Sequence, residues 1–226
     1  MHDLSHKVYE QMSRIGHALS DPTRLRMMNL LTQTERSVDE LSTMIGHSAP
    51  NTSAHLKVLQ STNLIRRRRE GRRVFYSIAS RSALNLWLAT RDMGLEESPE
   101  LREAMREVPD CDSVIQALDA ESLLAGVSSG ELTLLDLRPA EEYASGHIPF
   151  ARSIPFEELE ERLVELDPAT TIVAYCRGPF CFAAIESVAR LSERGFKVRR
   201  LSGGVAEWLS EGRDVESLPD ARLVEL

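Results

Sequence analysis

The pattern of apolar residues changes near the middle of this 226-residue chain, and that change constrains the fold more than any other feature. Up to about residue 94, apolar side chains recur at helical spacing, interrupted by two short strand-like runs. Beyond about residue 119, short apolar runs alternate with helical stretches. The first pattern predicts a mainly helical domain, and the second predicts a parallel sheet covered by helices. We therefore expect two domains of different architecture.

Capping signals divide the first half into short helices. Asp21 and Pro22 mark the start of one helix, because an N-cap carboxylate followed by proline favours the first helical turn. Ser37, with Glu40 three residues later, forms a capping box, and Ser48 caps the following helix. Two strand-like runs on either side of Gly71 predict a β-hairpin.

Three short helices followed by a basic hairpin are typical of a winged helix-turn-helix DNA-binding domain. The helix that Ser48 caps would place small and polar side chains against base edges, and the arginines of the hairpin would neutralise phosphates. The residues predicted to contact DNA from the helix are Ser48, Ala49, Asn51, Thr52, Ser53, His55 and Lys57. Those predicted on the wing are Arg67, Arg68, Arg69, Arg72 and Arg73.

The distribution of charge agrees with a nucleic-acid partner for the first half alone. Residues 1–97 carry 14 lysines and arginines against 10 acidic residues, whereas residues 98–226 carry 13 against 25. The net charge of −8 hides this difference, and only the basic half suits a polyanion.

Residues 8–93 resemble the ArsR/SmtB family of bacterial repressors. The resemblance rests on three stretches, 18–26, 55–59 and 69–76. It implies a homodimer built from the first and last helices of the domain and bound to a palindromic operator in double-stranded DNA. We expect Trp87, on the last helix, either in that interface or in the core of the domain. The metal ligands of sensors in this family are missing, since Ser37-Val38-Asp39 stands where a Cys-Val-Cys element is common. No metal site is predicted.

A pair of cysteines follows one of the strand-like runs of the second half. The run 171–175 ends at a turn that leads into a predicted helix over 181–193. That turn, the predicted catalytic loop, consists of Cys176, Arg177, Gly178, Pro179, Phe180 and Cys181. A helix N-terminus and the adjacent Arg177 are expected to lower the pKa of the Cys176 thiol, and Gly178 permits a positive φ.

Residues 115–215 resemble a rhodanese domain. Its three ordered signatures lie at 135–155, 175–178 and 201–212. The resemblance implies that Cys176 accepts sulfane sulfur as a persulfide and passes it to a thiol acceptor. Related phosphatases close a longer loop with arginine, but Phe182 stands at that position here. Asp136 and His147 are expected to be structural and to brace the turn and the strand end beside the loop.

Two roles are open for Cys181: a resolving thiol that attacks the Cys176 persulfide, or a buried residue at the start of a helix. Cys111 is expected to have no functional role in the linker.

A further helix is predicted over 156–164.

We predict an N-terminal, mainly α winged helix-turn-helix domain over residues 1–96, a linker over 97–113 and a C-terminal α/β rhodanese-like domain over 114–226. The leading hypothesis is a cytoplasmic homodimeric transcriptional repressor that senses a sulfane-sulfur donor such as thiosulfate or polysulfide through Cys176. One alternative is an active sulfurtransferase with an appended DNA-binding domain. Another is a sensor of arsenic or another soft species through Cys176 and Cys181. No cofactor and no membrane association are expected.

Overall fold

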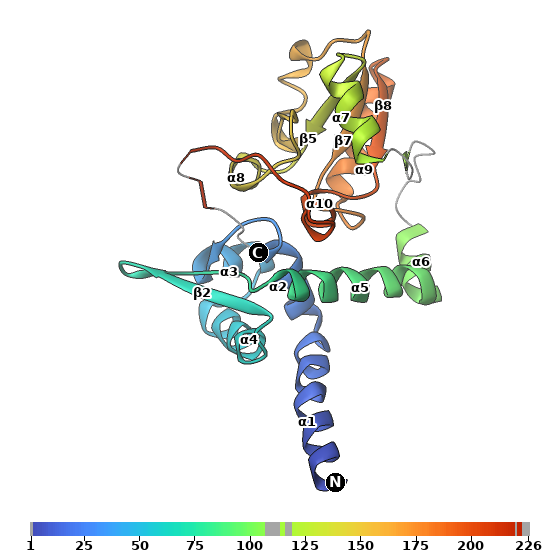
Figure 1. Ribbon diagram of the computed structural model, residues 1–226. Helices are drawn as coiled ribbons and strands as arrows, with labels where there is room; N and C mark the ends of the chain where they lie inside the picture. Colours follow the sequence, from blue (N-terminus) through green and yellow to red (C-terminus); the bar gives the residue numbers. More distant parts are fainter. Residues whose placement is uncertain (1, 107–113, 116–118, 220, 223–226) are drawn as a thin grey trace. The chain divides into compact units, whose positions relative to one another are not determined.

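The computed structural model describes residues 2–106, 114–115, 119–219 and 221–222 (Figure 1). They form two compact units, one ending at Ala89 and the other starting at Thr90. The domain limits inferred from the sequence, at residues 96 and 114, stay a prediction. None of the helices in the described ranges has both the length and the apolar character needed to cross a bilayer.

Helices and one hairpin build the first unit, which confirms the winged helix-turn-helix pattern. The helices are α1 (His2–Leu19), α2 (Pro22–Leu31), α3 (Val38–Ile45), α4 (Ala49–Ser61) and the first half of α5 (Arg81–Glu97). The strands β2 (Ile65–Glu70) and β3 (Arg73–Ile78) pair antiparallel and form the wing. Gly71 lies in the turn between them with a φ of 58°, a conformation that glycine adopts without strain.

The predicted helix starts are confirmed by hydrogen bonds. The Asp21 side chain accepts a bond of 3.0 Å from the backbone N–H of Arg24. Ser37 and Glu40 form a capping box. The Glu40 N–H donates to the Ser37 hydroxyl at 3.2 Å, and the Ser37 N–H donates to the Glu40 carboxylate at 2.6 Å. Gly46 ends α3 in the left-handed conformation with a φ of 78°. These local signals set where the short helices α2 and α3 begin and where α3 ends.

A short strand, β1 (Arg36–Ser37), was not expected from the sequence. It pairs antiparallel with β3, so that the wing is part of a three-stranded sheet in the order β1–β3–β2. Two residues are too few to show an alternating pattern, and only their pairing with Phe75 and Tyr76 reveals them as a strand.

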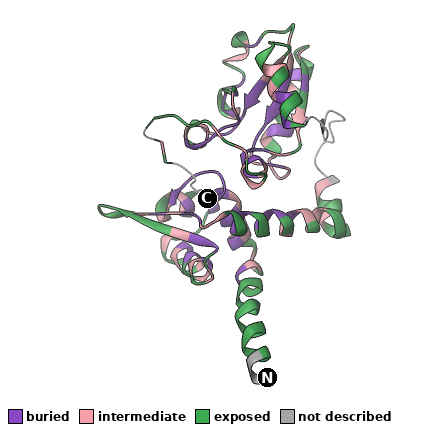
Figure 2. Ribbon diagram, viewed as in Figure 1, coloured by how far each residue is buried: buried purple, intermediate pink, exposed green. Residues whose placement is uncertain are grey.

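Helix α1 and Trp87 differ sharply in burial. Trp87 is 4% exposed, so the expectation of a surface Trp87 in the dimer interface is wrong and its place in the core is confirmed. In contrast, α1 is exposed along most of its length (Figure 2). The exposed apolar side chains of α1 are Val8, Tyr9, Met12 and Ile15.

The described residues of the second unit form a five-stranded sheet in the order β4–β8–β7–β5–β6, which is parallel at every pairing. The strands are β4 (Val114–Ile115), β5 (Leu132–Asp136), β6 (Arg152–Ser153), β7 (Thr171–Tyr175) and β8 (Lys197–Leu201). The α-helices that follow α5 are α6 (Pro99–Arg106), α7 (Ala120–Ser128), α8 (Ala140–Ser145), α9 (Phe182–Glu193) and α10 (Val205–Ser210). The predicted α/β architecture with a parallel sheet is confirmed.

Two segments differ from expectation. The predicted helix over 156–164 is wrong, because the chain there forms two separate 3₁₀ turns, η1 (Phe156–Glu158) and η2 (Leu163–Glu165). The Phe156 N–H bonds to the Leu137 carbonyl at 3.1 Å, which ties the segment to the end of β5 instead of to a helix of its own. The predicted linker contains helix α6, and its Cys111 lies outside the described residues.

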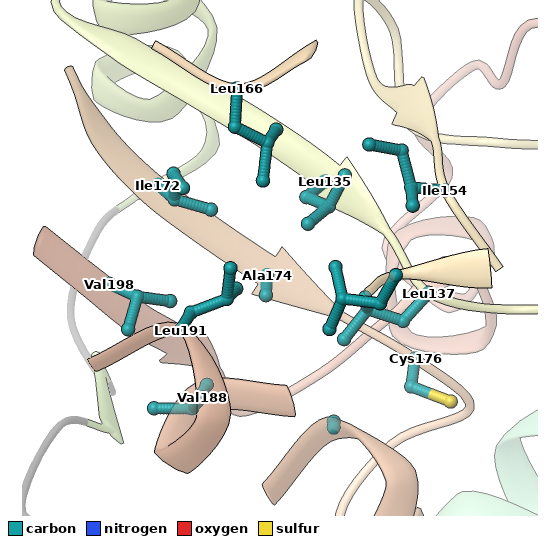
Figure 3. Packing of buried hydrophobic residues seen from close by; sticks show 12 residues of the cluster. Leu135, Leu137, Ile154, Leu166, Ile172, Ala174, Cys176, Val188, Leu191 and Val198 are labelled. Carbon is teal, nitrogen blue, oxygen red and sulfur yellow. The ribbon is translucent and has the colours of Figure 1, made fainter. Parts of the chain in front are cut away.

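Strand β7 is buried on both faces, and its side chains divide between two cores. Ile172 and Ala174 pack with α9 on one face, in the cluster of Figure 3. Val173 and Tyr175 pack with α7 and α10 on the other. The sheet is therefore the middle of three layers, and the residue after Tyr175 is the first that can leave it.

A buried ion pair closes the carboxyl end of β5. The side chains of Asp136 and Arg138 are both fully buried, and the guanidinium donates to the carboxylate at 2.6 to 3.1 Å. The same guanidinium donates to the Gly146 carbonyl at 2.7 Å. Burial alone would lower the pKa of Arg138, but the Asp136 carboxylate raises it, so the guanidinium stays charged.

Replacing Asp136 by asparagine is expected to destabilise this sheet, since it leaves a buried guanidinium without its counter-charge. The free energy of opening of the β5 and β7 amides, measured by hydrogen exchange of the full chain, should fall by about 3 to 5 kcal/mol. The control is Glu165→Gln, which breaks the exposed pair of Glu165 with Arg162. That change should cost under about 1 kcal/mol. Equal effects of the two changes would contradict a structural role for the buried pair.

Candidate functional site

The predicted catalytic loop lies between β7 and α9, at the carboxyl edge of the parallel sheet. Tyr175 ends the strand, and Phe182 is the first residue of the helix. Cys176 is 4% exposed and lies at one end of the buried cluster (Figure 3). Ligands of open α/β sheets bind at this edge, because the loops that leave the strands converge there. The structure therefore places the loop where the sequence predicted it, between a strand and a helix.

Cys176 and Cys181 are joined by a disulfide bond. Their Cα atoms are 6.2 Å apart, within the usual range for bonded cysteines. Cys181 is also the N-cap residue of α9, but its side chain accepts no capping hydrogen bond. The two cysteines that the sequence places five positions apart thus have their sulfur atoms together.

Arg177 is turned to a buried carboxylate. Its guanidinium donates from Nε and Nη2 to both oxygens of Glu142, at 2.7 to 3.0 Å. Glu142, on α8, is fully buried, whereas the Arg177 side chain is 23% exposed. Arg177 is therefore paired with a carboxylate, and the expectation that it lowers the pKa of the Cys176 thiol stays a prediction. The pair ties the loop to α8, and nothing in the sequence alone indicated Glu142 as its partner.

Two glycines give the loop its path. Gly178 has a φ of 102°, which confirms the positive φ expected there. Gly204, just before α10, passes so close to the loop that a Cβ on it would overlap the carbonyl oxygen of Cys176. Between them, Pro179 and Phe180 are half-buried, and the Cys181 N–H donates to the Gly178 carbonyl at 3.1 Å. The loop is a tight turn with a fixed backbone.

A buried polar network supports the strand that carries the loop. The Tyr175 hydroxyl accepts a bond of 3.2 Å from the Ile148 N–H. Burial, and then the charge of Asp136, raises the pKa of Tyr175 well above its ordinary value, so the phenol stays neutral. His147 Nδ1 lies 2.8 Å from the Tyr143 carbonyl, and its ring stacks on that of Tyr143. Asp136 thus holds the end of β5 and His147 holds the turn after α8.

The helix predicted to read DNA, α4, exposes part of the predicted set. Asn51 and Lys57 are exposed, whereas Ala49 and Ser53 are half-buried. Thr52 is fully buried, so its predicted contact with DNA is wrong. Helical periodicity turns Thr52 towards the core, on the same face as the buried Leu56 and Leu59.

The N-cap residue of α4 and one residue within the helix have partners inside the protein. The Ser48 hydroxyl is the N-cap and lies 3.5 Å from the Asn51 nitrogen. His55 Nδ1 lies 3.6 Å from the Asp21 carboxylate. Partial desolvation opposes ionisation of Asp21, but the Arg24 N–H and the charges of Arg24 and His55 hold the pKa of Asp21 below its usual range. Asp21 therefore caps α2 and anchors His55.

The arginines of the wing divide into two groups. Arg68 donates to both oxygens of Glu35 at 2.8 to 3.3 Å and to Glu70 at 2.8 Å, and it lies over the Phe75 ring. Glu35 is buried, so Arg68 is the residue that fastens the wing to the body of the domain. Arg68 is itself exposed, as are the remaining predicted arginines of the wing, namely Arg67, Arg69, Arg72 and Arg73.

No group of three or more histidine, cysteine or acidic side chains with metal-binding geometry occurs in the described ranges. At the position where metal sensors of the resembled family carry cysteines, Ser37 serves as a helix cap.

Two family models match the chain. That of the bacterial regulatory proteins of the arsR family matches residues 21–67, and that of the rhodanese-like domain matches residues 119–211. The HTH-type transcriptional regulator Rv0324 of Mycobacterium tuberculosis is 38% identical over 207 residues, which cover 92% of this chain and 91% of that protein. The chain belongs to the ArsR family of transcriptional regulators. It is a DNA-binding regulator with a rhodanese-like domain.

Other relatives match one part of the regulator. The transcriptional repressor SmtB homolog of Synechocystis sp. is 38% identical over 89 residues, covering 39% of this chain and 67% of that protein. A sulfurtransferase of Allochromatium vinosum is 30% identical over 101 residues, covering 44% of this chain and 92% of that protein.

The two groups of wing arginines are expected to respond differently to salt. Arg67→Ala should lower the slope of log affinity against log salt by about 0.9, the contribution of one phosphate contact. Arg68→Ala should change the slope by less, because two carboxylates already neutralise Arg68. Fluorescence anisotropy with a duplex selected by the full-length protein measures both. Equal changes of slope would mean that Arg68 leaves Glu35 to bind DNA.

Proposed function

We propose that this regulator is a homodimeric repressor whose affinity for a palindromic operator changes when Cys176 carries sulfane sulfur. The observation that carries the proposal is the rhodanese loop, which places a pair of cysteines at the carboxyl edge of a sheet in a chain that also contains a DNA-binding unit. A reactive thiol tied to a DNA reader suits a chemical sensor better than it suits a constitutive enzyme.

Loading of Cys176 is a single displacement at sulfur. The Cys176 thiolate attacks the sulfane sulfur of a polysulfide or of thiosulfate, and a new S–S bond forms as the old one breaks. The leaving group is a shorter polysulfide in the first case and sulfite in the second. The product is a persulfide on Cys176.

The exposed surface of the first unit supports a dimer that binds DNA. The apolar side chains of α1, such as Tyr9 at 67% and Met12 at 59% exposure, gain from burial against a second copy. The exposed Asn51 and Lys57 of α4 supply groups for base edges and phosphates, and the exposed wing arginines supply further phosphate contacts.

A second candidate is a working sulfurtransferase, which the rhodanese-like domain and the similarity to a protein named as a sulfurtransferase favour. It differs from the sensor in kinetics. An enzyme would turn over thiosulfate with an acceptor such as cyanide at a steady rate, and its affinity for DNA would not depend on the sulfur on Cys176.

Operator affinity is therefore expected to depend on sulfur only when Cys176 is present. Polysulfide should change the affinity of the reduced native chain by a factor of about 5 to 150, the usual range of coupling between two sites. Cys176→Ser should bind the same DNA and show no response. Anisotropy with and without polysulfide, under anaerobic conditions, measures this. Identical behaviour of the two proteins would leave the sulfurtransferase as the better description.

A further inference from the structure

We propose that Cys181 resolves the persulfide on Cys176, so that loading ends in an intramolecular disulfide and released sulfide. The inference rests on the proposed function, because it needs a persulfide on Cys176. It goes beyond that function by assigning a second reactive thiol and by stating what becomes of the sulfur. In this mechanism the loop is a switch that discards its sulfur, whereas a sulfurtransferase delivers it.

The placement of the two sulfur atoms supports the assignment. The disulfide between Cys176 and Cys181 forms with a Cα separation of 6.2 Å, so the described backbone already permits attack of one sulfur on the other. An intramolecular nucleophile at this distance competes well with thiols from solution, because its orientation is already fixed.

The environment of Cys181 suits a nucleophile. It is half-buried and occupies the N-cap of α9, with no acidic side chain in the first turn of that helix. The free N–H groups at a helix start favour a thiolate. The Cys181 side chain makes no capping bond, so once the disulfide is reduced no cap competes for its sulfur.

Contacts with neighbouring segments hold both ends of the loop, which keeps the two sulfur atoms close together. At the Cys176 end, β7 is paired on both sides and Gly204 packs against the Cys176 carbonyl. In the middle, Arg177 is bound to the buried Glu142. At the other end, the Cys181 N–H donates to the Gly178 carbonyl.

The resolving step is a displacement at sulfur that needs no further oxidant or reductant. The Cys181 thiolate attacks Sγ of Cys176, the bond between Sγ and the outer sulfur breaks, and the outer sulfur leaves with the electron pair as hydrosulfide. The sulfane sulfur is reduced to sulfide, and the two cysteines are oxidised to the disulfide. A dithiol reductant returns the loop to its starting state. Since the disulfide carries no sulfane sulfur, the resolved protein has nothing to transfer.

The test follows the fate of the sulfur in the reduced full-length protein, treated anaerobically with inorganic polysulfide and then alkylated. Intact mass should show the native chain without two hydrogen atoms and without added sulfur, together with released sulfide. Cys181→Ser should instead gain one sulfur atom on Cys176, and cyanide should convert that sulfur to thiocyanate. Cys181→Ala serves as a second variant, and Cys111→Ser as the matched control, which should behave as the native chain.

Steady-state kinetics provide an independent readout. With thiosulfate and cyanide, the native chain should slow after its first turnover as the disulfide accumulates, whereas Cys181→Ser should continue. A dithiol should restore the native chain.

The outcomes separate this proposal from the proposed function. If the native chain and Cys181→Ser hold the same stable persulfide, the resolving role is overturned while sensing through Cys176 stands. A bridge that retains the added sulfur between the two cysteines would also overturn sulfide release. If neither protein gains sulfur nor forms the disulfide with polysulfide, persulfide loading itself fails, and both proposals fall together.

Discussion

The burial of β7 on both faces is the constraint on which the candidate site depends. Its residues alternate between two apolar cores, and strands β5 and β8 pair with it on either side. A strand held in this way cannot slip by one residue without turning Tyr175 and its neighbours into the wrong core. Cys176 is therefore the first residue that can leave the sheet, and its thiol is presented at the edge where the loops converge.

Arginine and carboxylate pairs then hold the functional segments in place. Arg177 binds the buried Glu142 beside the thiol, and Arg68 binds the buried Glu35 beneath the wing. In both cases the sequence motif suggests an arginine that binds an anionic ligand, but the structure pairs that arginine with a carboxylate of the protein. A buried carboxylate left without its partner is costly, so these pairs restrain the backbone around Cys176 and the wing.

Local signals in the sequence predicted most elements, because short-range hydrogen bonds form them. The caps at Asp21 and Ser37, the wing around Gly71 and the run that became β7 each depend on residues within a few positions. The two-residue strands β1, β4 and β6 were not predicted, because only their pairing with neighbouring strands identifies them as strands. The helix predicted over 156–164 is wrong for a related reason, since the Phe156 N–H bonds to the Leu137 carbonyl, just after β5.

The sequence by itself determined the two kinds of domain, the position of the loop between the cysteines and the start of α4, because periodicity, caps and ordered motifs are local properties. Only the tertiary structure decided which side chains of those motifs are free. It buried Thr52 and Trp87, and it brought Glu142 to Arg177 across 35 residues of sequence. It also joined Cys176 to Cys181, a contact that the spacing permitted but left open. Burial and long-range pairing depend on how distant segments pack, and no local pattern encodes that.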